Sequence, residues 1–110
     1  MTPAIIANLE KLLDGPRDSA LLRYSLGNEH LKAGDPAQAT IRFQEAVARA
    51  AQFSAAWKLL GKALADSGKT AEALGAYEHG IIVAEAKGDV QAAKEMTVFA
   101  RRLRKQLGGE

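Results

Sequence analysis

The chain contains no cysteine and few aromatic residues among its 110 positions. Without cysteine it can form neither disulfide bonds nor a thiolate metal site. Three Phe, two Tyr and one Trp leave small residues, above all alanine, to fill much of the core. Such a composition, with few β-branched residues, favours helices that approach one another closely.

Long apolar runs are absent as well. No stretch approaches the roughly 18 apolar residues of a membrane-spanning helix. Residues 1–14 lack a basic start and a long apolar run, so they do not resemble a signal peptide, and we expect a cytoplasmic protein. A length of 110 residues predicts a single domain, 1–110. The net charge of +2 reflects four basic residues against one acidic residue in the last ten positions.

Glycine, proline and capping residues divide the chain into six predicted helices. Thr2 and Pro3 begin the first helix, 3–14, which Asp14-Gly15-Pro16 ends. The later helices are expected to follow caps at Asp18 or Ser19, Asp35, Ser54, Thr70 and Asp89, and to end near Gly34, Ala51, Gly68, Lys87 and Leu107, before Gly108 and Gly109. No segment alternates in the manner of a strand, so we predict an all-α fold of antiparallel helices.

Six residue pairs recur at a constant offset of 34 residues, which is typical of a tandem structural repeat. Most of these residues are small or apolar, and stacked helical repeats form binding surfaces rather than catalytic clefts. The pairs are Leu26 and Leu60, Gly27 and Gly61, Gly34 and Gly68, Ala37 and Ala71, Ala39 and Ala73, and Phe43 and Tyr77.

The order of these residues is similar to that of a tetratricopeptide repeat. The second copy has Trp57, Leu60, Gly61, Leu64, Gly68, Ala73 and Tyr77, and the first has Leu26, Gly27, His30, Gly34, Ala39, Phe43 and Ala46. Residues 20–87 therefore resemble the tetratricopeptide repeat family, with repeat one at 20–53 and repeat two at 54–87. The resemblance implies an α-solenoid of helical hairpins. Because two repeats leave apolar faces open, we expect helices 3–14 and 89–107 to cover them.

Three features depart from the family pattern. Arg23 stands where the second copy has Trp57, and Gly80 stands where the first copy has Ala46. Helix 89–107 has neither Leu-Gly nor Trp at the offsets of a third copy, so we interpret it as a capping helix. Its predicted inward stripe is Val90, Ala93, Met96, Ala100, Leu103 and Leu107, with Lys94, Arg101 and Lys105 outward.

Glycine within a helix needs a compensating reason, since it costs roughly 1 kcal/mol relative to alanine. For Gly27 and Gly61 we predict close approach of a second helix, with Ala39 or Ala73 facing the gap. The aromatic residues Phe43, Trp57 and Tyr77 are then expected to fill the wedge between successive hairpins.

The family resemblance also implies a binding groove lined by the first helix of each repeat. By position, repeat one contributes Leu21, Tyr24, Asn28 and Leu31, and repeat two contributes Ala55, Lys58, Lys62 and Ala65. Two lysines one turn apart favour an acidic partner segment, the alternative being that they only solvate an exposed face. Of the carboxylate-clamp residues known in the family only Asn28 matches, because Tyr24 and Leu59 replace an expected lysine and asparagine.

We therefore predict a protein–protein interaction module that binds a partner peptide or helix in the groove. The alternative is a structural module that self-associates through an uncovered terminal face, for example as a homodimer. No nucleophile–base pattern, phosphate loop or metal-binding spacing is present, so we expect no enzyme activity, small-molecule substrate, cofactor or metal. His30 is predicted to lie in the core and His79 on the outer face of its helix. The basic tail, residues 101–105, has no aromatic residues between its cations, which argues against binding of nucleic acid.

Overall fold

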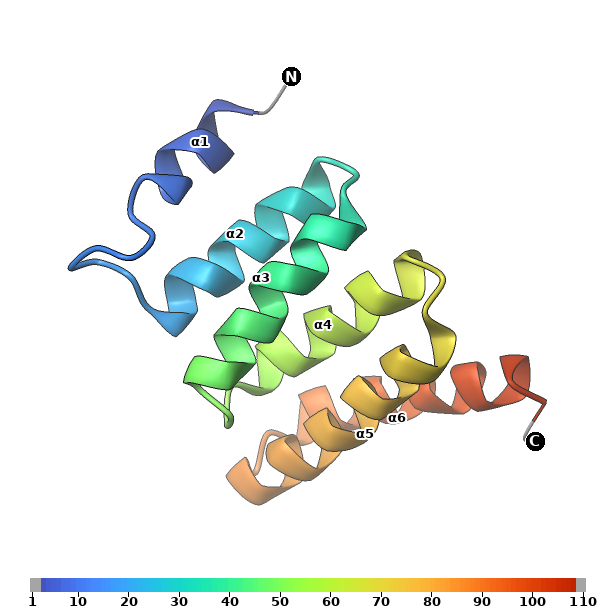
Figure 1. Ribbon diagram of the computed structural model, residues 1–110. Helices are drawn as coiled ribbons and strands as arrows, with labels where there is room; N and C mark the ends of the chain where they lie inside the picture. Colours follow the sequence, from blue (N-terminus) through green and yellow to red (C-terminus); the bar gives the residue numbers. More distant parts are fainter. Residues whose placement is uncertain (1–2, 109–110) are drawn as a thin grey trace.

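The computed structural model describes residues 3–108 and confirms the all-α fold (Figure 1). Successive helices run antiparallel and pack in sequential pairs, as predicted. Thr2, the predicted first cap, and Gly109, which follows the predicted last helix, lie outside the described residues. The helices are α1 (Ala4–Glu10), α2 (Ala20–Lys32), α3 (Pro36–Arg49), α4 (Ser54–Asp66), α5 (Thr70–Lys87) and α6 (Val90–Gln106).

Side-chain caps begin three of the helices as expected. Ser19 accepts the backbone N–H of Leu22 at 3.0 Å, and Asp35 accepts that of Gln38 at 3.1 Å. Asp89 caps α6 in the same way. These caps satisfy N–H groups that have no partner in the first helical turn.

Two predicted caps are wrong. The N-caps of α4 and α5 are Phe53 and Lys69, and neither makes a side-chain capping bond. Ser54 and Thr70 are the first helical residues instead. The hydroxyl of Ser54 donates to the Asp89 carboxylate at 2.8 Å and so ties the start of α4 to the start of α6.

The first helix is shorter than predicted. It ends at Glu10, and residues 11–14 form tight turns in which Leu12 and Leu13 bond to carbonyls three residues back. Asp14 then adopts a left-handed φ of 64°, a region that asparagine and aspartate tolerate better than most residues. Its N–H donates to the Asp18 carboxylate at 2.8 Å.

The glycines within the two hairpins are required by aromatic rings. A Cβ added to Gly27 would lie 2.6 Å from Cε1 of Phe43, and one added to Gly61 would lie 2.5 Å from Cε1 of Tyr77. Ala39 and Ala73 are fully buried, but the prediction that they face the glycines missed these rings. Phe43 and Tyr77 thus pack within each hairpin, not only between hairpins.

Trp57 occupies a different environment from the other two aromatic residues. It is half-buried, its Nε1 donates to the Ala51 carbonyl at 2.9 Å, and its ring stacks on His79 with centroids 4.1 Å apart. His79 is exposed as predicted, but it covers one face of the Trp57 ring. His30 is buried as expected.

Gly80 allows α6 to pack closely on α5. A Cβ at Gly80 would lie 2.5 Å from Sδ of Met96 and 2.8 Å from Cβ of Trp57, so an alanine like Ala46 would not fit. Four residues of the predicted α6 stripe are buried, but Val90 and Leu107 are 60% and 49% exposed. These two end positions were wrong, because Val90 lies one turn before Lys94 on the outer face of α6 and Leu107 follows the last helical residue, Gln106.

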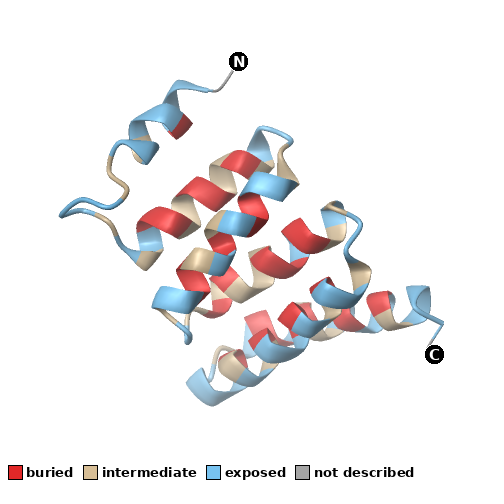
Figure 2. Ribbon diagram, viewed as in Figure 1, coloured by how far each residue is buried: buried red, intermediate tan, exposed pale blue. Residues whose placement is uncertain are grey.

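The core lies between the helices from α2 to α6, and most of α1 is exposed (Figure 2). In α1 only Ile6 is buried. Helix α4 contacts α2 on one side and α6 on the other, so α2, α4 and α6 form one row of neighbouring helices. None of the helices within residues 3–108 is both long and apolar enough to cross a membrane.

Candidate functional site

A pocket lies between α4 and α6, and it contains part of the predicted groove. Lys58, Lys62 and Ala65 line it, as the family resemblance implied. Its volume is about 380 Å³, within the range of small-ligand pockets. We call it the α4–α6 pocket; it is lined by Lys58, Leu59, Lys62, Ala65, Asp66, Tyr77, Glu95 and Phe99.

None of the predicted residues on α2 lines this pocket. The ring of Tyr24 lies 4.7 Å from that of Phe53 and 5.9 Å from that of Phe43, so it helps to join the first hairpin to the start of α4. Leu31 also packs against the core, while Asn28 is half-buried and Leu21 is 63% exposed. The structure thus brings together three of the eight predicted groove residues.

The lysines of the pocket are paired with acids. Lys58 Nζ lies 2.7 Å from Oε1 of Glu95, and this ion pair joins α4 to α6. Lys62 Nζ lies 3.2 Å from Oδ2 of Asp66, one turn further along α4. The hydrogen bond from Lys58 lowers the pKa of Glu95. The prediction of an acidic partner depended on free lysine charge, and here that charge is balanced.

The floor of the pocket is apolar. The rings of Tyr77 and Phe99 lie 5.4 Å apart at a tilt of 42°, a favourable aromatic arrangement. Burial, with a smaller effect of Asp66, raises the pKa of Tyr77 to about 12. Arg102 places its guanidinium 6.0 Å from the centroid of the Phe99 ring. The site therefore combines an aromatic floor with a charged rim.

Sequence reasoning missed the two residues that α6 contributes to this pocket. Glu95 and Phe99 are one turn apart on α6, a spacing that places them on one helical face. Their spacing was visible in the sequence. Their position opposite Lys58 was not, because the 34-residue period does not carry over to α6.

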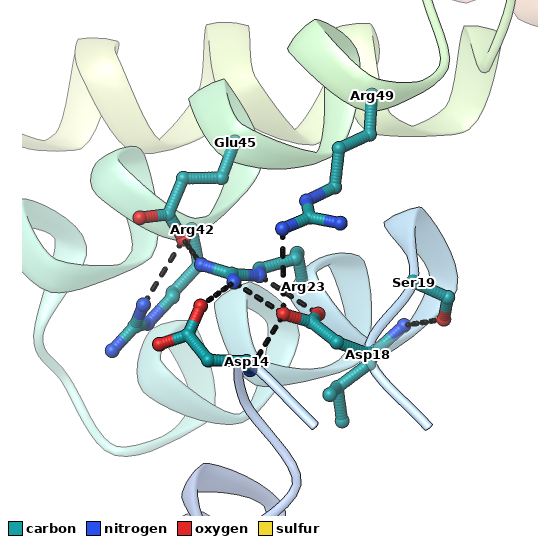
Figure 3. Close-up of polar contacts among 8 residues, drawn as sticks. Asp14, Asp18, Ser19, Arg23, Arg42, Glu45 and Arg49 are labelled. Atoms are coloured by element: carbon teal, nitrogen blue, oxygen red, sulfur yellow. Dashed lines mark hydrogen bonds and ion pairs between the residues drawn. The ribbon is translucent and has the colours of Figure 1, made fainter. Parts of the chain in front are cut away.

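A second polar cluster is centred on Arg23, the residue that replaces the repeat tryptophan (Figure 3). Its guanidinium binds the carboxylates of Asp18, Glu45 and Asp14, with Nε 3.0 Å from Asp18 Oδ1 and Nη1 2.9 Å from Glu45 Oε1. The side chain of Arg23 is only 8% exposed. Arg42 and Arg49 add further contacts to Glu45 and Asp18. This cluster fastens the segment before α2 to the first hairpin.

Among residues 3–108, four carboxylates have lowered pKa values, which predicts a fold that is sensitive to acid. The Arg23 hydrogen bond holds the pKa of Asp18 far below its usual range, and the Ser54 hydroxyl lowers that of Asp89. Burial opposes ionisation of Glu45, but the Arg23 and Arg42 guanidiniums lower its pKa overall. The pKa of Glu95 is lowered as well. A carboxyl with a lowered folded pKa stabilises the fold above its unfolded pKa, about 4, and loses this contribution as the pH falls further.

We therefore expect the melting temperature to be lower at pH 3 than at pH 7, as measured by circular dichroism. The Asp18→Asn variant should show a smaller difference between the two pH values, because one linked carboxyl has been removed. Equal melting temperatures of the wild-type protein at pH 7 and pH 3 would contradict this assignment of the ion pairs.

The outer face of α6 forms a second hollow, next to the end of α5. Val90 and Val98 line it and are 60% and 41% exposed, with Glu85 and Lys94 beside them. Within residues 3–108 no helix follows α6 to cover this hollow.

In the basic tail, Arg104 pairs with Glu78 at 2.9 Å. Among residues 3–108, no group of His, Asp and Glu side chains is arranged to hold a metal ion.

Comparison with known proteins gives the chain clear relatives. A TPR repeat-containing protein of Pseudomonas aeruginosa is 48% identical to it over 99 residues, which are 90% of this chain and 94% of that protein. No protein-family model matches the chain.

Solved structures with the same fold are also known. A Bordetella parapertussis protein with a solution structure is 36% identical, with a TM-score of 0.80 over 94% of this chain and 90% of that one. A tetratricopeptide repeat domain protein of Salinibacter ruber is 27% identical, with a TM-score of 0.73 over 84% of this chain and 92% of that one.

Proposed function

Because the chain belongs to the family of tetratricopeptide repeat proteins, we propose that it is a protein–protein interaction module that binds a segment of a partner protein along α2, α4 and α6. Tetratricopeptide repeats generally mediate protein interactions. Within this module we assign residues 20–53 and 54–87 as the two repeats, 89–107 as the C-terminal cap and 3–14 as the N-terminal segment that contains α1. The cytoplasmic location predicted from the sequence stays a prediction.

The observation that carries this proposal is the α4–α6 pocket. Its walls come from two helices that are not consecutive in the chain, so it exists only when the hairpins stack. It combines apolar surface with a few polar groups, which is the usual make-up of a binding site. Exposed Leu21 and half-buried Asn28 on α2 extend the same row of helices.

Peptide selection followed by NMR mapping tests the proposal. Peptides selected from a random display library against the wild-type protein should shift backbone amides of α2, α4 and α6, including Asn28, Lys62 and Ala65. Amides on the exposed side of α3, such as that of Ala48, serve as the internal control. Selected peptides that shift only the α3 side or the ends of the molecule would contradict binding along the groove.

The exposed valines of α6 favour a second candidate, self-association. Val90 and Val98 line the hollow beside Glu85 and Lys94, so a second copy related by a two-fold axis could cover the valines and pair the opposite charges. Sedimentation velocity from about 10 µM to about 1 mM distinguishes the two, since association at this face requires a mass that rises with concentration. A strict monomer at every concentration would eliminate this candidate.

A further inference from the structure

We infer that the α4–α6 pocket selects its partner through an aromatic or large aliphatic anchor side chain, and not through an acidic one. This inference rests on the proposed function and specifies the chemistry of the segment that is bound. It reverses the prediction of an acidic partner segment, which the sequence analysis based on Lys58 and Lys62.

The first argument is that the charged side chains on the pocket rim sum to zero, so the rim does not attract an acidic ligand. It carries two cations, Lys58 and Lys62, and two anions, Glu95 and Asp66. Both lysines are already within 3.2 Å of a carboxylate oxygen. An incoming carboxylate would have to compete with Glu95 or Asp66 and would lie beside their negative charge. Exchanging one exposed ion pair for another gains little.

The second argument is the floor of the pocket. Leu59, Ala65, Tyr77 and Phe99 present apolar surface, and Tyr77 and Phe99 are already packed ring against ring. A third ring could add to this pair in a tilted or offset arrangement, as aromatic side chains prefer. The pocket volume of about 380 Å³ exceeds the roughly 150 Å³ of a cavity that accepts benzene. Space and surface both fit a phenylalanine, tryptophan or leucine side chain.

The third argument concerns the residues that flank such an anchor. Lys58, Lys62 and Asp66 follow one another at four-residue spacing on α4, so the rim changes sign along the groove. Across the groove, Glu95 faces Lys58. A partner segment that carries both acidic and basic residues around its anchor complements this mixture of charges on the rim. A uniformly acidic tail does not.

Two small probes separate these chemistries. N-acetyl-L-phenylalaninamide carries the anchor, and N-acetyl-L-glutamic acid α-amide carries the carboxylate on a similar backbone. The phenylalanine probe should shift the amides of Lys62, Ala65 and Phe99 in the wild-type protein, with a dissociation constant on the order of 1 mM for a ligand of this size. The glutamate probe should shift these amides at least tenfold less at equal concentration.

A pair of variants locates the binding. Ala65→Phe places a ring in the pocket from its own wall, and we expect it to weaken the binding of the phenylalanine probe at least tenfold. Ala48→Phe adds the same ring to the exposed face of α3 and should leave binding unchanged. Melting curves of both variants verify that each is folded, and if Ala65→Phe is unfolded, Ala65→Leu replaces it.

Each other result overturns the inference. If the glutamate probe shifts the pocket amides more than the phenylalanine probe, the pocket recognises acids, and the groove proposal stands. If neither probe shifts them up to about 50 mM, roughly 50 times the expected dissociation constant, the pocket is not an anchor site. In that case the display-selected peptides decide the groove proposal independently, because they report on α2 as well as on the pocket.

Discussion

Replacing Gly61 by valine is expected to lower the free energy of unfolding by about 3 kcal/mol, the upper end of the cost of overpacking a core. The first added carbon would lie 2.5 Å from the Tyr77 ring, closer than real Cβ contacts allow. The ring cannot easily move away, because Tyr77 is 4% exposed and packs on Phe99. Urea denaturation followed by circular dichroism measures the change.

Gly75 provides the matched control for this prediction. Gly75 lies within helix α5, as Gly61 lies within α4, but a Cβ added to Gly75 would meet nothing within 4 Å. Gly75→Ala should therefore stabilise the protein by up to about 1 kcal/mol, the difference in helix propensity between the two residues. A Gly61→Val variant as stable as the wild-type protein would show that the hairpin helices do not approach as described.

Replacing Arg23 by alanine is expected to cost about 3 kcal/mol of unfolding free energy, the lower end of the range for breaking a buried ion pair. The carboxylates of Asp18 and Glu45 would each lose their Arg23 partner. We use the lower end because Asp14, the third partner, is 88% exposed and Arg49 still reaches Asp18. Chemical denaturation gives the magnitude.

Hydrogen exchange tests where this loss acts. In Arg23→Ala, amides of residues 11–19 and of α2 should exchange faster, because the cluster fastens this segment, while those of α5 and α6 should change less. Arg17→Ala is the control, since Arg17 is exposed in the same segment and should change stability by less than about 0.5 kcal/mol. If Arg23→Ala lowers the free energy of unfolding by less than about 0.5 kcal/mol, the change expected for the control, a structural role for the cluster is refuted.

Local signals in the sequence predicted most of the fold correctly. Ser19, Asp35 and Asp89 precede helices, and Gly34 and Gly68 end them with φ values of 78° and 79°. The C-terminal end of α1 and the N-caps of α4 and α5 were less predictable. Ser54 and Thr70 are good capping residues, but a cap depends on which residue leaves the helical conformation first, and here that residue is Phe53 or Lys69.

The candidate site was harder to predict than the fold because its residues come from distant parts of the chain. Helix α4 starts 34 residues after α2, but α6 starts 36 residues after α4, because α5 is four residues longer than α3 and the loop after it is two residues shorter. The repeat period therefore misplaces α6, and the pairing of Lys58 with Glu95 could not be read from it. The Arg23 cluster was visible only as a missing tryptophan, since its partners lie on two separate segments, residues 11–19 and α3.

The affinity of a display-selected peptide for three variants tests the central claim, that the row of α2, α4 and α6 is the binding surface. Asn28→Trp and Ala65→Trp each place a bulky ring on this row, and Ala48→Trp places the same ring on the exposed face of α3. Isothermal titration calorimetry should show at least tenfold weaker binding for the first two variants and wild-type affinity for the third. Unchanged affinity in Asn28→Trp and Ala65→Trp, with a loss in Ala48→Trp, would contradict the account.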